Sequence, residues 1–109
     1  MEEDVTIVRV YISEADHGRR RTLMNEALSL LRTRHGMNGV TIFRAIAGAS
    51  ESGEIHAADL LRLTVDLPVV VEFFDRPEAV AEVMPALREL ARGHKIVSWP
   101  ARMIRDPAG

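Results

Sequence analysis

The sequence contains no cysteine, which excludes a disulfide framework, a thiolate metal site and a cysteine nucleophile. It has little net charge: 14 basic and 16 acidic residues leave a formal charge of −2, without the basic surplus typical of nucleic-acid-binding domains. Its apolar runs are only a few residues long, so no membrane-spanning segment is predicted. The acidic start, Met1-Glu2-Glu3-Asp4, argues against a signal or transit peptide. These absences favour a cytoplasmic domain that neither inserts into a membrane nor binds nucleic acid.

Motifs for nucleotide phosphates and for catalysis are absent as well. The sequence has no Gly-x-x-x-x-Gly-Lys-Ser/Thr run and no Gly-x-Gly-x-x-Gly run. No two of its histidines have the spacing of a metal site on a helix. No serine or threonine has a visible base beside it, and the acidic residues are dispersed. We therefore predict no catalytic residue, no metal ligand and no enzymatic activity.

Hydrophobic residues make up 47% of the 109 residues and charged residues 28%, a composition typical of one globular domain, here residues 1–109. Alternating and helical patterns predict strands and helices in the order β-α-β-β-α-β. The predicted segments are strands Val5–Ile12, Gly39–Ala47, Val69–Phe74 and Ile96–Ile104, and helices Arg20–His35 and Pro77–Arg92. This order predicts an α+β, ferredoxin-like sandwich, an antiparallel sheet with two helices on one face.

Several local features refine this prediction. The first helix has a core-facing stripe and a stop at Gly36, and Asp75 with Glu78 forms an expected capping box before the second helix. Pro100 demands an edge position or a bulge for the last strand. The connection between the second and third strands, from Gly48 to Leu67, is long enough to suggest a function. The expected stripe is Leu23, Met24, Ala27, Leu28, Leu31 and His35, and the connection is expected to end in a short helix through Ala58, Leu60, Leu61 and Leu63.

Both faces of the predicted sheet are apolar, although helices cover only one. We infer that the open face packs on a second copy of the chain. Arg9, Arg44 and Glu72 lie among apolar residues there, and we expect Glu72 to pair with an arginine, because buried charges need partners. Trp99 is expected to pack in the core or an interface. The open face would expose Val5, Ile7, Tyr11, Val40, Ile42, Ile46, Val70 and Phe74, or their counterparts on the other face.

Basic turns supply candidate anion ligands. His17-Gly18-Arg19-Arg20-Arg21 precedes the first helix, where free N–H groups favour anions, although a solvated basic turn is the plainer interpretation. Arg92-Gly93-His94-Lys95 precedes the last strand. Together with Arg44 and Gly48, this second turn could hold a phosphate or nucleotide, and His56 is a further candidate contact.

The sequence resembles the domain-of-unknown-function 190 family of the PII-like signalling superfamily. The resemblance rests on Arg44-Ala-Ile-Ala-Gly48, Ile55-His56 and Asp66-Leu-Pro68, and it extends over nearly the whole chain through Val10-Tyr-Ile12, Glu14-x-Asp16 and Leu87–Gly93. The chain departs from the family pattern at Ala45, Ala49 and Thr64, where the family often has glycine, an aromatic residue and serine.

This resemblance implies a homotrimer with the sheets facing inward. It implies that a small ligand, often an adenine nucleotide, binds in clefts between protomers near Arg44, Gly48, His56, Arg92, Gly93, His94 and Lys95. It also implies that loop 48–66 contacts a target protein, often a membrane transporter. Two alternatives stay open: a small ferredoxin-like enzyme that uses His56 beside Asp59 as a base, and a trimeric metal-binding protein of the copper-tolerance type.

Overall fold

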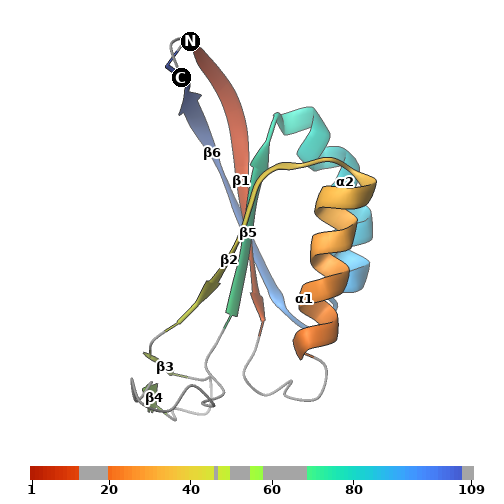
Figure 1. The fold of residues 1–109 in the computed structure, drawn as a ribbon, viewed down its shortest axis with the longest axis vertical. Coiled ribbons are helices and arrows are strands. Elements are labelled where there is room, and N and C mark those ends of the chain that lie inside the picture. The colour runs from red at the N-terminus through yellow and green to blue at the C-terminus, as the bar shows by residue number, and fades with distance from the viewer. Residues whose placement is uncertain (13–19, 46, 50–54, 58–68, 107–109) are drawn as a thin grey trace.

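The structure is a computed structural model that describes residues 1–12, 20–45, 47–49, 55–57 and 69–106. Its elements follow the predicted order, with one short two-stranded addition (Figure 1). They are β1 (Glu2–Ile12), α1 (Arg20–Leu28), η1 (Ser29–Arg34), β2 (Asn38–Arg44), β3 (Ala47–Ala49), β4 (Ile55–Ala57), β5 (Val69–Asp75), α2 (Pro77–Leu90) and β6 (Lys95–Ile104).

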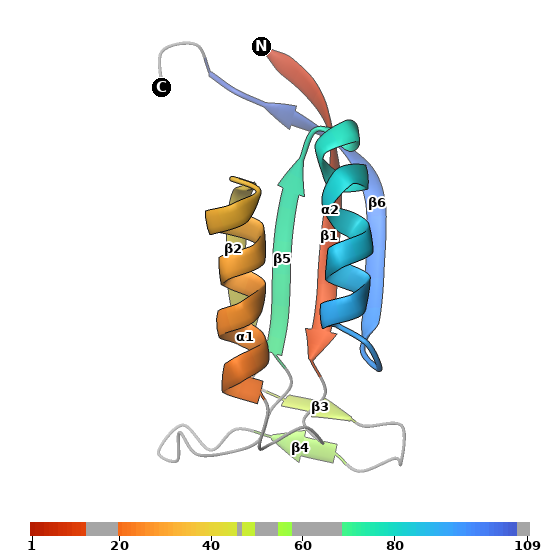
Figure 2. The same ribbon diagram turned by 90° about the vertical axis from the view of Figure 1, so that its right-hand side faces the viewer.

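The main sheet is antiparallel, with strand order β2-β5-β1-β6. Figures 1 and 2 show α1 and α2 side by side on one face of it. The predicted α+β, ferredoxin-like sandwich is therefore confirmed. Strand β6 is an edge strand, as Pro100 requires, because proline cannot donate to a neighbouring strand.

The core lies between the helices and one face of the sheet. The alternate residues of the two central strands are buried there, and the helices contribute the matching stripes. Each large apolar side chain that is fully buried contributes about 1.5–3 kcal/mol. The main contributors are Val8, Val10, Ile12, Leu23, Leu31, Val71, Phe73, Val80, Val83 and Leu87.

The first helix departs from the prediction in its second half. From Ser29 to Arg34 the chain forms a π-helix, whose wider turn rotates the following residues relative to an α-helix. Leu30 and Leu31 consequently face the core, whereas Leu28 and His35, both expected in the stripe, are exposed. The predicted stop is confirmed: Gly36 has φ +61°, and its N–H donates to the carbonyl of Arg32 at 3.1 Å.

The predicted capping box before α2 is wrong. The helix begins at Pro77, so Arg76 occupies the cap position without a side-chain hydrogen bond, and Asp75 lies one residue too early. The Asp75 carboxylate instead accepts the N–H of Arg76 at 2.7 Å and the N–H of Asn38 at 3.1 Å. This buried carboxylate therefore connects the start of β2 to the junction between β5 and α2.

Strand boundaries also differ from the prediction at both ends of the sheet. Strand β1 begins at Glu2 because β6 pairs with it as far as Ile104, beyond the point where β5 ends (Figure 1). Strand β2 ends at Arg44 rather than Ala47, and Ala47–Ala49 pairs with Ile55–Ala57 instead. The short helix expected through Ala58 and Leu63 lies outside the described residues.

Candidate functional site

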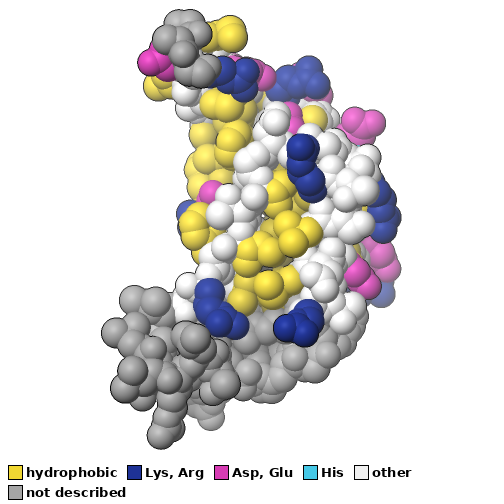
Figure 3. All heavy atoms as spheres, viewed as in Figure 1, with side chains coloured by type: hydrophobic (Ala, Val, Ile, Leu, Met, Phe, Trp, Pro, Cys, Tyr) yellow, Lys and Arg dark blue, Asp and Glu magenta, His cyan; other side chains and the backbone are white. Residues whose placement is uncertain are grey.

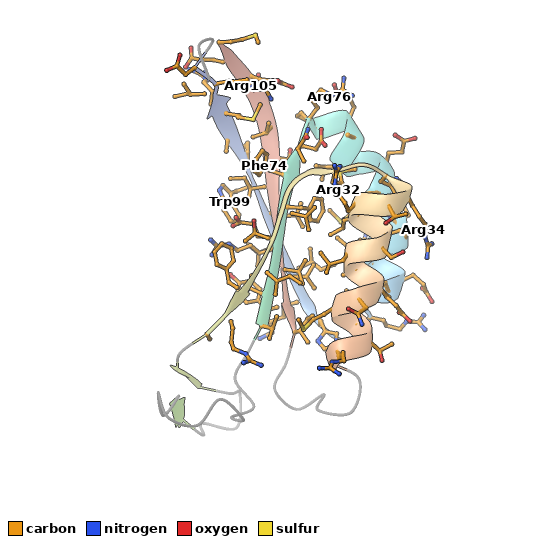
Figure 4. The ribbon with its side chains drawn as sticks, viewed as in Figure 1. Arg32, Arg34, Phe74, Arg76, Trp99 and Arg105 are labelled. Carbon is orange, nitrogen blue, oxygen red and sulfur yellow. The ribbon has the colours of Figure 1, made fainter. Side chains whose placement is uncertain are left out.

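The face of the sheet opposite the helices is largely apolar, and we call it the open face. Its residues are defined by the register: Ile7 is opposite Phe74 and Trp99, and Arg9 is opposite Glu72 and Val97. Figure 4 shows Trp99 on the side away from α1 and α2, and Figure 3 shows hydrophobic side chains gathered along this side. The open face consists of Ile7, Arg9, Tyr11, Thr41, Phe43, Val70, Glu72, Phe74, Lys95, Val97 and Trp99.

The register decides which of the two alternating sets is exposed on β2. Ile42 is opposite the buried Val71 and packs with Val40 against the core, whereas Phe43 belongs to the open face and is 46% exposed. The expectation that Val40 and Ile42 lie on the open face is therefore wrong. Their counterpart Phe43, which belongs to the alternate set of β2, lies there instead. Val5 is also buried rather than exposed.

The expected pairing of Glu72 with an arginine is confirmed. Arg9 Nε donates to Glu72 Oε1 at 2.7 Å. The Arg9 guanidinium also lies 5.4 Å from the ring centroid of Trp99 and 5.9 Å from that of Phe43, within the range of cation–π attraction. The hydrogen bond to Glu72, and secondarily one to Tyr11, raises the pKa of Arg9 above its ordinary value.

Arg44 does not share the open face with Arg9, contrary to the prediction. It is opposite Val69, which faces the helices, and it is the last residue of β2. Its side chain is exposed. Arg44 therefore lies at the end of the sheet where β2 leads into β3, available to solvent rather than enclosed among the apolar residues.

Gly48 and His56 are brought directly opposite each other. They are the central pair of the β3–β4 ladder, flanked by Ala47 with Ala57 and Ala49 with Ile55. Opposed residues in an antiparallel pair have Cα atoms about 4.5–5.5 Å apart. Gly48 and His56 are therefore neighbours across a short two-stranded ladder, which follows the end of β2 in the chain.

The basic turn from Arg92 to Lys95 connects α2 to β6. Gly93 adopts φ +90°, a backbone conformation that glycine tolerates better than any other residue. The N–H of His94 donates to the carbonyl of Ala91 at 2.9 Å. Arg92 is well exposed and forms a 3.9 Å ion pair with Glu89. Lys95 is opposite Tyr11 at the start of β6.

These candidates lie at one end of the sheet but at its opposite edges. Arg44 belongs to edge strand β2 and Lys95 to edge strand β6, with β5 and β1 between them. Three strand spacings of ~4.8 Å separate the edges by about 14 Å. One copy of the chain therefore does not bring the two groups together (Figure 2).

Two features are absent from the described part of the chain. No group of three or more histidine and acidic residues there is arranged to hold a metal ion. In the same part of the chain, none of the helices combines the length and the apolar character needed to cross a membrane. Of the basic run before α1, His17 and Arg19 lie outside the described residues, and Arg21 is exposed near the start of the helix.

Comparison with known proteins identifies the family. The family model DUF190, described as "Uncharacterized ACR, COG1993", matches residues 5–103. The chain belongs to the DUF190 family. A curated relative, the UPF0166 protein MJ1524 of Methanocaldococcus jannaschii, is 29% identical to this DUF190 chain over 91 residues, which are 84% of the chain and 82% of the relative.

Solved structures show the same fold at low sequence identity. CPII bound to ADP and bicarbonate, from Thiomonas intermedia K12, has a TM-score of 0.57 and 14% identity, covering 94% of this chain and 89% of that one. The divalent ion tolerance protein CutA1 from Ehrlichia chaffeensis also has a TM-score of 0.57, with 10% identity over 99% of this chain and 89% of that one. The fold of this DUF190 chain is thus PII-like.

Sequence reasoning missed the aromatic contacts of Arg9. Phe43, Arg9 and Trp99 lie on three different strands, so only the cross-strand register brings them together. The signal present in the sequence was the charge pattern: Arg9, Arg44 and Glu72 interrupt otherwise apolar strand faces, which predicted that Glu72 pairs with an arginine, and the structure shows that this arginine is Arg9.

Proposed function

We propose that the protein is a PII-like signalling protein that acts in the cytoplasm as a homotrimer. It binds a small anionic ligand in clefts between neighbouring copies, an adenine nucleotide being the first candidate. It has no catalytic role, and its loop 48–66 contacts a target protein such as a membrane transporter.

One observation carries this proposal: the basic candidates lie at the same end of the sheet but at opposite edges. A ligand that needs both groups must bind between the β2 edge of one copy and the β6 edge of the next. The apolar open face supplies the reason for copies to associate, because contiguous apolar surface of this kind is a common protein-binding surface.

The chemistry of the two groups suits a phosphate-bearing ligand. The exposed Arg44 guanidinium can form two parallel hydrogen bonds to phosphate oxygens, and the neighbouring Gly48–His56 pair is close to it in the chain. From the next copy, Gly93 would let the backbone approach the ligand closely while Arg92 and Lys95 add positive charge. The similarity to CPII, solved with ADP and bicarbonate, makes adenine nucleotides the first ligands to test.

Calorimetric titration with ATP, ADP, AMP and cyclic nucleotides tests this proposal. We expect binding by at least one of them, and we expect Arg44→Ala to weaken it about 10- to 100-fold, the loss of about 1.5–3 kcal/mol typical of a charged hydrogen bond. Arg34→Ala is the matched control, an exposed arginine at the far end of the helix layer (Figure 4). A folded trimer that gives no heat with any nucleotide rejects the nucleotide version of the proposal.

Mixing two variants with weakened binding tests whether the cleft is shared. Arg44→Ala removes the β2-edge group and Arg92→Ala removes the β6-edge group. If each cleft takes one group from each of two copies, mixed assemblies contain some intact clefts and recover part of the binding. No recovery in assemblies that demonstrably contain both variants would refute a shared cleft. A divalent cation retained through purification would instead favour the metal-binding alternative. This alternative is tested because the fold is similar to that of the divalent ion tolerance protein CutA1.

A further inference from the structure

Four residues of the open face form one row across the end of the sheet. Phe43 is opposite Val70, which is also opposite Tyr11. Tyr11 is in turn opposite Lys95, so each strand contributes one residue to this end row. Strand β1 ends one residue later, at Ile12, and β6 begins at Lys95. The end row therefore lies at the end of the sheet that carries the basic candidates.

The accessible aromatic surface of the open face is concentrated in this end row. Tyr11 is 38% exposed and Phe43 is 46% exposed, whereas Phe74 and Trp99, in the row at the other end of the face, are only partly exposed. The chain thus presents its most accessible rings beside the candidate ligand site rather than at the far end of the face.

Tyr11 is the ring that has a cationic neighbour of the candidate site. Opposed residues on one face of an antiparallel pair have Cβ atoms about 4.5–5.5 Å apart, so Tyr11 and Lys95 share one small area of surface. The ring of Phe43 instead lies 5.9 Å from the Arg9 guanidinium, at the opposite edge of the sheet. A ligand bound at Lys95 consequently has Tyr11 as its nearest aromatic side chain on this face.

The ring of Tyr11 is held from its hydroxyl end. The hydroxyl accepts a hydrogen bond from Arg9, and Arg9 Nε donates to Glu72 Oε1 at 2.7 Å. The Arg9–Glu72 pair therefore positions the tyrosine ring within the open face. A side chain that is already ordered loses little conformational entropy when a ligand binds to it.

We propose that Tyr11 binds a planar ring of the ligand while Lys95 beside it binds the anionic group. This inference rests on the proposed function, because it concerns the same site, and it adds that the ligand carries an aromatic ring as well as a phosphate. Aromatic side chains stack on any base, since every base has a π-face. Tyr11 thus selects ligands with a ring over simple phosphates, without selecting adenine in particular.

Calorimetric titration with ADP and with inorganic diphosphate tests this inference, because both probes carry phosphates and only ADP carries a ring. We expect Tyr11→Leu to weaken ADP binding about 5- to 100-fold, the range of base–aromatic stacking, and to leave diphosphate binding unchanged. Tyr11→Phe keeps the ring, so its ADP affinity should stay within about threefold of the wild-type value. Phe43→Leu is the matched control, since it removes an exposed ring of the same row at the other edge, and it should bind ADP as the wild type does.

A second measurement detects contact with the ring itself. Tyr11 is the only tyrosine of the chain, so tyrosine-specific labelling gives the nuclear magnetic resonance signals of this one ring. ADP should shift these ring signals through stacking, whereas diphosphate should leave them nearly unmoved. Sedimentation of the same samples shows whether each variant keeps the assembly of the wild type.

Two calorimetric results would overturn the inference. Tyr11→Leu that binds ADP as tightly as the wild type would show that the ring does not contact the ligand. Tyr11→Leu that loses ADP and diphosphate binding alike would show that the ring supports the site without recognising a ring. If diphosphate gives no heat, or if Tyr11→Leu no longer assembles, the wild-type ring signals decide, and signals unmoved by saturating ADP refute the contact.

The same titrations separate this inference from the proposed function. If Arg44→Ala weakens ADP binding and Tyr11→Leu does not, the inference fails and the proposed cleft stands. A wild type that binds no nucleotide removes both.

Discussion

Gly39 is required by two features of its position. Its φ of +57° is disfavoured for any side chain, and a Cβ atom there would fall within the ring of Phe74. The close approach occurs beside an irregularity in the pairing of β2 with β5, between Asn38 and Thr41. The ring of Phe74 therefore lies against backbone that only glycine provides.

We predict that Gly39→Ala lowers the free energy of unfolding by about 2–4 kcal/mol, the sum of backbone strain and displacement of the ring. Urea denaturation at 25 °C measures it. Gly36→Ala is the control, since Gly36 has a similar φ of +61° but open space around it, and only the strain of about 1–2 kcal/mol applies. Equal losses in the two variants would contradict the assigned contact with Phe74.

Asp75 is the second residue whose role differs from the expected one. Because its carboxylate accepts backbone N–H groups of Asn38 and Arg76, Asp75→Ala should leave two donors without this partner and destabilise the fold by about 1–3 kcal/mol. Glu89→Ala, which removes an exposed 3.9 Å ion pair, should change stability by less than about 0.5 kcal/mol. Chemical denaturation compares the two, and an unchanged midpoint for Asp75→Ala would contradict the connection between β2 and α2.

At the level of elements, hydrophobic periodicity was sufficient to predict the order of strands and helices. It was not sufficient to predict which residues of each element face the core. Alternation along β1 and β5 correctly predicted a sheet with two apolar faces. Periodicity near α1 assumed a regular helix, so it could not anticipate the π-helix that turns Leu30 inward. The capping box failed because a shift of one residue in the helix start changes the partner of Asp75.

The π-helix predicts which leucine contributes to stability. Leu30→Ala should lower the free energy of unfolding by about 2–4 kcal/mol because Leu30 is buried, whereas Leu28→Ala should cost under about 1 kcal/mol. Thermal and urea unfolding of both variants measure this. A larger loss for Leu28→Ala would indicate the regular helix that the sequence pattern suggested.

The candidate site shows the same limit of local sequence reasoning. Arg44, Gly48 and His56 lie in or next to one connection of the chain, but their distance from the turn Arg92–Lys95 depends on the strand order, which no local pattern encodes. The contacts of Arg9 with Phe43 and Trp99 depend on the cross-strand register for the same reason.

At the level of the whole molecule, the two layers leave one face of the sheet without cover (Figures 1 and 3). A surplus charge on this face should therefore prevent assembly without unfolding the chain. Phe43→Glu should give a folded monomer, because Arg9 already pairs with Glu72, and burying the surplus negative charge of a second carboxylate in the interface costs several kcal/mol. Leu28→Glu, on an exposed part of the helix layer, should assemble normally. Size-exclusion chromatography with light scattering distinguishes these outcomes, and normal assembly of Phe43→Glu would place the interface elsewhere.

The solution mass of the unmodified protein tests the central claim most directly. Sedimentation equilibrium at micromolar concentration should give three times the 12.1 kDa of the chain, since the open face and the divided candidate site both need neighbouring copies. A stable, well-folded species of 12.1 kDa would contradict the account.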